Sequence, residues 1–173
     1  MRLRIAVAGA AALALAACTK PPLTDQQKAA LADSVKQYAE GPFTATFEHP
    51  TVEKVMALYA PGDDILVVDF GRIYAGRDAV TALGRQWWGH PGMTAHFTQS
   101  SPHVAVLDRD AAVYTAMVTG ALKDSAGVET PMNFAWTGVF VRVGGEWKLQ
   151  VEHSSLPPAS PAPAKPAVAA KRH

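Results

Sequence analysis

Apolar residues recur at helical spacing in three stretches of the first half of the chain. A capping-box sequence precedes the first stretch, and prolines or glycines follow each of them. The pattern therefore predicts helices from Thr24 to Gly41, from Pro50 to Pro61 and from Asp78 to Gly89.

Alternating and β-branched residues predict strands elsewhere in the chain. A strand over 63–70 and a short extended segment over 72–76 lie between the second and third predicted helices. Four longer strands are expected over 94–107, 111–123, 132–143 and 146–154. This order predicts an α+β fold, in which helices cover one side of a curved antiparallel sheet.

The two glycines at residues 144 and 145 predict a two-residue hairpin turn between the last two strands. Counting outward from that turn places Trp136 opposite His153, with Gly138 nearby as a gap for a ligand or a bend. One apolar face of the hairpin then carries Trp136, Phe140, Trp147 and His153. A slip of one residue would move all four side chains to the other face.

Residues 1–17 have the composition of a bacterial signal peptide, with two arginines before an apolar run of thirteen residues. The run ends in Leu15-Ala16-Ala17-Cys18, which resembles a lipobox, the site at which a cysteine is acylated. Because Cys18 is the only cysteine, we expect it to be lipidated, and we expect no disulfide, cysteine-bound metal or thiol catalysis. The alternative is an ordinary secretory signal with a chance cysteine.

The charge of the remaining chain argues against nucleic-acid binding. Five of the 16 Lys and Arg residues lie in the leader or near the C-terminus, which leaves 11 against 15 Asp and Glu. A nucleic-acid-binding domain needs a basic face. The histidines show no metal-ligand spacing, and no nucleotide-binding glycine pattern occurs, so we expect no metal and no cofactor.

Residues 157–173 are rich in Pro and Ala, and we expect them to form a disordered tail. Residues 18–23 would be a short linker that joins the lipidated cysteine to one domain over 24–156. A lipidated cysteine implies attachment to the cell envelope on the periplasmic side. The residue after Cys18 is Thr19 rather than Asp, which favours the outer membrane where one exists.

The domain resembles the nuclear transport factor 2-like superfamily, and within it the SnoaL-like and ketosteroid-isomerase-like branch. The resemblance rests on a strand that ends in Asp69, the Tyr-x-Gly-Arg-Asp-Ala sequence at 74–79, and Trp147 followed by His153 and Ser154. It implies a cone-shaped sheet with three helices on its concave side. It also implies an apolar cavity, which we expect to be lined by Tyr59, Trp87, Trp88, Trp136, Phe140 and Trp147.

Asp69 and His153 are the candidate catalytic residues. In the ketosteroid isomerase pattern, a carboxylate at the end of the first strand moves a proton between carbon atoms, and the spacing from Asp69 to Gly76 is similar. Alternatively, Asp69 caps the turn at Gly71 and His153 is a structural residue with local hydrogen bonds. No oxyanion hole can be identified, which argues against steroid isomerisation.

These observations predict an envelope lipoprotein that binds a small, largely apolar molecule, either with or without isomerase-, dehydratase- or cyclase-type proton transfer. The alternative is a non-catalytic envelope module that binds another protein. The resemblance also implies a homodimer, and Thr137, Val139 and Val141 predict its interface on the outer sheet face.

Overall fold

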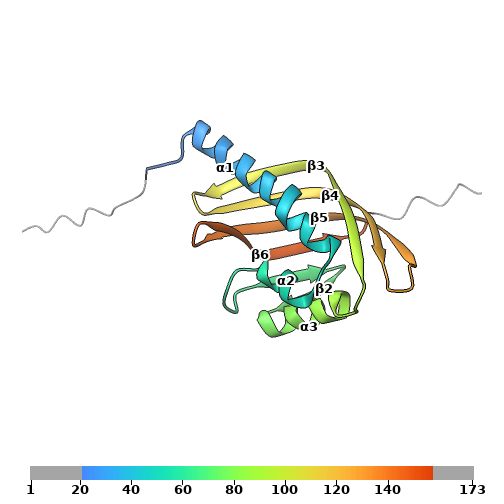
Figure 1. Cartoon of the computed structure of the whole chain (residues 1–173). Coiled ribbons are helices and arrows are strands. Elements are labelled where there is room, and N and C mark those ends of the chain that lie inside the picture. Colours follow the sequence, from blue (N-terminus) through green and yellow to red (C-terminus); the bar gives the residue numbers. More distant parts are fainter. Residues whose placement is uncertain (1–20, 158–173) are drawn as a thin grey trace, which may run out of the picture.

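The computed structural model describes residues 21–157 (Figure 1). The predicted leader, Cys18 and nearly all of the predicted tail lie outside these residues. The described elements are α1 (Asp25–Tyr38), the π-helical turn η1 (Ala39–Phe43), the 3-10 turn η2 (Thr46–Glu48), α2 (Val52–Ala57), β1 (Leu66–Asp69), β2 (Arg72–Ala75), α3 (Arg77–Trp88), β3 (Thr94–Asp108), β4 (Ala111–Lys123), β5 (Glu129–Val143) and β6 (Glu146–Ser155).

Helix α1 starts at the predicted capping box. The backbone N–H of Gln27 donates to Oγ1 of Thr24 at 3.2 Å, and the backbone N–H of Thr24 donates to Oε1 of Gln27 at 3.0 Å. These bonds satisfy two donors that a helix start would otherwise leave free. The chain continues beyond α1 into η1, so that the buried residues Val35, Ala39 and Phe43 follow one another at intervals of four.

The six strands form one sheet in the order β2-β1-β6-β5-β4-β3. All neighbouring strands are antiparallel except β1 and β6, which pair in parallel. The sheet is therefore mixed, which differs from the antiparallel sheet that we expected. Alternation along a strand reveals which face is buried, but it carries no information about the direction of a neighbour that is distant in sequence.

The helices lie on one face of the curved sheet, as predicted, and the α+β class is confirmed (Figure 1). Helix α1 packs against β3 and β4, while α3 packs against α2 and β2. Aromatic rings join these layers: the ring centroid of Phe43 in η1 lies 5.1 Å from that of Trp136 and 5.8 Å from that of Phe140. Within residues 21–157, no helix is long and apolar enough to cross a membrane.

A β-bulge in β6 overturns part of the predicted hairpin register. Arg142 lies opposite Trp147 and Phe140 opposite Leu149, as expected, but Val139 then lies opposite Val151. Gln150 is therefore an extra residue on β6.

Beyond the bulge every pairing shifts by one residue. Trp136 lies opposite Ser154 rather than His153, and Gly138 lies opposite Glu152. The predicted pairing of Trp136 with His153 is wrong. Because strand side chains alternate between faces, the extra residue turns Glu152 inward and His153 outward.

Candidate functional site

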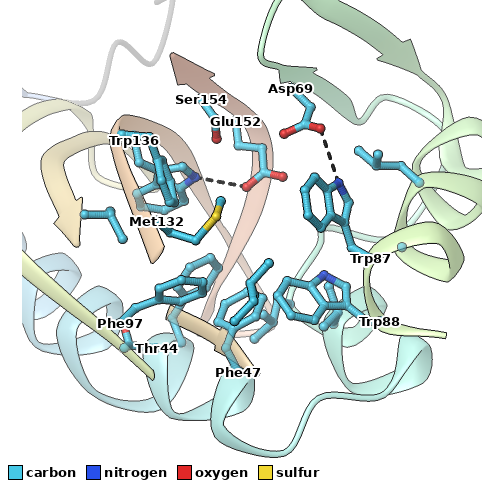
Figure 2. Close-up of a pocket in the computed structure, with 18 of the residues that line it drawn as sticks. Thr44, Phe47, Asp69, Trp87, Trp88, Phe97, Met132, Trp136, Glu152 and Ser154 are labelled. Atoms are coloured by element: carbon cyan, nitrogen blue, oxygen red, sulfur yellow. Dashed lines mark hydrogen bonds between the residues drawn. The ribbon is translucent and has the colours of Figure 1, made fainter. Parts of the chain in front are cut away.

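A cavity of about 130 Å³ lies between the concave face of the sheet and the helices. Its size is comparable to that of an apolar protein cavity of roughly 150 Å³ that accepts benzene. Aromatic rings supply much of its wall, and among them are Phe43, Phe47, Tyr59, Phe70, Trp87, Trp88, Phe97, Phe134 and Trp136. Figure 2 shows two carboxyl groups, those of Asp69 and Glu152, at this largely apolar wall.

Glu152 enters the cavity from β6 and is held by two hydrogen bonds. The hydroxyl of Tyr59 donates to Oε1 at 2.6 Å, and Nε1 of Trp136 donates to Oε2 at 3.1 Å (Figure 2 draws the second). Tyr59 follows α2 and Trp136 lies on β5, so the carboxyl group is fixed from two separate parts of the fold. A partly buried polar group needs such partners, and they define its orientation.

Burial is the main influence on the titration of Glu152, and it raises the pKa of this carboxyl above the ordinary glutamate value. The bonds from Tyr59 and Trp136 lower the pKa, and the nearby charge of Asp69 raises it. Burial also raises the pKa of the Tyr59 hydroxyl well above its usual value, with a further contribution from Glu152. Tyr59 therefore remains a hydrogen-bond donor, and Glu152 retains its proton to higher pH than an exposed glutamate does.

Asp69 reaches the same cavity from the end of β1. Nε1 of Trp87 donates to its Oδ2 at 3.3 Å (Figure 2). Burial raises the pKa of the Asp69 carboxyl, while the bond from Trp87 and the charge of Arg72 lower it. Among the described residues, Asp69 accepts no backbone hydrogen bond from the turn that follows it.

Gly138 gives space to a ring of the protein rather than to a ligand. A Cβ atom at this position would lie 2.8 Å from the Trp136 indole and 2.9 Å from Cδ1 of Leu149. Gly138 lies directly opposite Glu152 on the inner face of the sheet. The missing side chain therefore leaves room for the indole that donates to Glu152.

The structure brings together only some of the predicted site residues. Five of them line the cavity, namely Tyr59, Asp69, Trp87, Trp88 and Trp136. Phe140 is fully buried in the core and is absent from the cavity wall. Trp147 lines a separate surface groove, where the guanidinium of Arg142 lies 4.7 Å from its ring centroid. His153 is exposed and lies outside the cavity.

The position of Glu152 in the alternation of β6 predicts an outward-facing side chain, so Glu152 is absent from the residues expected at the site. Lys148, Gln150 and Glu152 form an unbroken polar series, and nothing in it indicates the bulge. One feature of the sequence could have indicated Glu152: it is an acidic residue directly before His153, which was predicted to lie on the apolar face. Within residues 21–157, no group of three or more His, Cys, Asp or Glu side chains is placed to hold a metal ion.

The model of the SnoaL-like domain family matches residues 37–160, which is more than half of the chain. A comparison with curated protein sequences gives no significant match. Solved structures share the fold at low sequence identity. A nuclear transport factor 2-like protein from Pseudomonas putida has 21% identity and a TM-score of 0.59, over 75% of this chain and 88% of that chain.

Two further structures illustrate the range of proteins that share the fold. A ketosteroid isomerase-like protein from Erwinia carotovora atroseptica has 18% identity and a TM-score of 0.56, over 76% of this chain and 97% of that one. The association domain of CaMKII from C. elegans has 17% identity and a TM-score of 0.58, over 77% of this chain and 100% of that one. These similarities establish a shared fold and nothing more specific.

Proposed function

Because the chain belongs to the SnoaL-like domain family, we propose that its concave cavity binds a small, largely apolar molecule with a polar group. The observation that carries this proposal is the oriented carboxyl group of Glu152 in an aromatic cavity. Ligand sites commonly combine apolar walls with a few well-placed polar groups. Groups with shifted pKa values in a cavity are also candidates for function.

The two carboxyl groups also support proton-transfer chemistry of the isomerase, dehydratase or cyclase type. Glu152, which retains its proton to a raised pH, donates a hydrogen bond or a proton to a ligand carbonyl or hydroxyl. Asp69 is the candidate base, since burial raises the pKa of its carboxyl and so makes the carboxylate a stronger base, while Trp87 and Arg72 partly stabilise the charged form. His153 has no part in this proposal, because it faces away from the cavity.

Ligand binding is tested with a thermal-shift and tryptophan-fluorescence screen of steroids, aromatic polyketide-like compounds and fatty acids. A bound molecule is expected to change the emission of Trp87 and Trp88, which line the cavity. Glu152→Gln should weaken binding of a hit by up to about tenfold, since a neutral hydrogen bond contributes about 0.5–1.5 kcal/mol. His153→Gln is the matched control and should bind as wild type does.

Two results would count against the cavity as a binding site. If no compound raises the melting temperature or changes the fluorescence, the alternative of a protein-interaction module is favoured. If Glu152→Gln binds a hit as tightly as wild type does, the carboxyl group has no role in recognition.

We propose further that the domain is anchored to the periplasmic side of the envelope through acylated Cys18, with the outer membrane favoured. The leader sequence and the lipobox-like Leu15-Ala16-Ala17-Cys18 support this localisation. Cys18→Ser is expected to leave an unprocessed precursor that does not incorporate labelled palmitate, whereas Thr19→Ser should be processed normally. Palmitate labelling of the Cys18→Ser protein would contradict the proposal.

The outer face of the sheet supports the proposal of a homodimer. Val139 lies between Val113 on β4 and Val151 on β6, and Val151 lies opposite Leu66 on β1. These four partly exposed apolar side chains form a row across adjacent strands. Such a continuous apolar surface is typical of an interface.

Val139→Glu is expected to convert the dimer into monomers, because it places a charge in the middle of this row. Val128→Glu is the control, since Val128 is 60% exposed in the loop before β5. Light scattering coupled to size-exclusion chromatography measures the mass of each variant. A wild-type monomer, or a Val139→Glu dimer, would show that the outer face is not the interface.

A further inference from the structure

Gln99 on β3 and Glu152 on β6 both line the cavity. Strands β4 and β5 separate them in the sheet. The side-chain nitrogen Nε2 of Gln99 donates to the backbone oxygen of Ala39 at 3.0 Å and to Oγ1 of Thr44 at 2.6 Å. Figure 2 shows Thr44 on the side of the cavity away from Asp69. Gln99 therefore places an amide near the part of the wall that is remote from the carboxyl groups.

The direction of this amide follows from its partners. The oxygen of Ala39 can only accept hydrogen bonds, and it also accepts one from the Thr44 hydroxyl at 2.7 Å. The hydroxyl proton is used in that bond, so Thr44 presents a lone pair to Gln99. Both neighbours require an N–H donor, and a reversed amide would bring oxygen against oxygen.

This orientation leaves the other atom of the amide without a partner. Oε1 of Gln99 is buried and accepts no hydrogen bond from any of residues 21–157. A buried acceptor without a donor is unfavourable, and native proteins normally satisfy such groups with protein, water or ligand. The atoms that surround this part of the cavity are largely apolar, for example those of Phe47 and Phe97.

We propose that the molecule in the cavity carries a hydroxyl or N–H group, which Gln99 accepts through Oε1. This inference rests on the proposed function. It restricts the class of candidate ligands to ring compounds that carry a hydroxyl or N–H group. The aromatic wall contacts the rings, Gln99 accepts from the donor, and the carboxyl groups face a different part of the molecule. Gln99 thus determines specificity, because an analogue without the donor leaves Oε1 unpaired.

The test uses three pairs of probes in which a methyl group replaces a hydroxyl: phenol and toluene, 2-naphthol and 2-methylnaphthalene, and 4-phenylphenol and 4-methylbiphenyl. Calorimetry measures their binding to the purified full chain. At least one hydroxyl probe is expected to bind about tenfold more tightly than its methyl partner. Gln99→Met retains a side chain of similar length without the acceptor, and it should remove this preference while the methyl probe still binds.

Gln37→Met is the control, because Gln37 is exposed outside the cavity and the same substitution there should leave the preference intact. Equal binding of both members of every pair to the wild-type chain would overturn the inference and leave cavity binding established. An undiminished preference in Gln99→Met would also overturn it. If none of the six probes binds, this inference is overturned, and the screen of steroids, polyketide-like compounds and fatty acids separately decides the proposed function. The wild-type comparison does not depend on the folding of any variant.

Discussion

Glu152→Gln is expected to make the protein more stable than wild type at about pH 8 and nearly equal to it at about pH 4. Burial raises the pKa of Glu152 in the folded state, whereas the unfolded chain has an ordinary glutamate pKa. Between these two values the folded state binds more protons than the unfolded state. The free energy of unfolding therefore decreases as the pH rises through this window.

The effect has a defined upper limit. One proton changes the free energy of unfolding by at most about 1.4 kcal/mol per pH unit. Gln cannot ionise, and its amide can still pair with Tyr59 and Trp136. Asp69 also has a raised pKa, so the double variant with Asp69→Asn should depend still less on pH.

Urea unfolding at a series of pH values from about pH 4 to about pH 8 measures this difference. Glu129→Gln is the matched control, because the Glu129 side chain is 64% exposed and forms an ion pair with the exposed Lys123. Parallel stability curves for wild type and Glu152→Gln would show that the pKa of Glu152 is not raised in the folded state. A stability difference that increasingly favours wild type as the pH rises would contradict the sign of the shift.

Insertion of one alanine between Val151 and Glu152 is expected to destabilise the protein strongly, by at least about 3 kcal/mol. The inserted residue would shift the rest of β6 by one position against β5, which brings Glu152 opposite Thr137 and His153 opposite Trp136. Glu152 would then point outward and lose its bonds to Tyr59 and Trp136, while His153 would turn toward the aromatic interior. The parallel pairing of β6 with β1 would be disturbed as well.

Gln150→Ala retains the bulge and is the control, with an expected change within about 0.5 kcal/mol. Chemical unfolding measures the loss of stability, and tryptophan fluorescence reports on the surroundings of Trp136. An insertion variant as stable as Gln150→Ala would show that β6 tolerates either register. The stability of the fold would then not depend on the inward orientation of Glu152.

Local patterns in the sequence predicted the helices and most of the strands well. The capping box at Thr24 sets the start of α1, and the glycine pair forms the turn between β5 and β6. β4 covers the predicted residues 111–123, and β5 begins three residues earlier than expected. These features depend on interactions between residues that are close in the chain, so single-sequence reasoning can recover them.

The site was predicted only in part, and the errors at Glu152 and His153 can be traced to one extra residue, Gln150. Five predicted residues belong to segments whose buried faces follow from their own periodicity. All five line the cavity, namely Tyr59, Asp69, Trp87, Trp88 and Trp136. His153 and Glu152 lie beyond the bulge, where the faces are reversed. The bulge forms where Leu149 also bonds, on its other side, to the chain at Leu58 and Ala60.

The sequence by itself therefore determined the α+β class and the order of the elements, because periodicity and turn chemistry are local, whereas an apolar cavity with Asp69 was implied by the family resemblance. Tertiary structure decided the parallel pairing of β1 with β6, the inward direction of Glu152 and the unpaired oxygen of Gln99. Each of these depends on contacts between segments far apart in the chain. A register shift of one residue changes the face of a side chain without changing the local pattern that surrounds it.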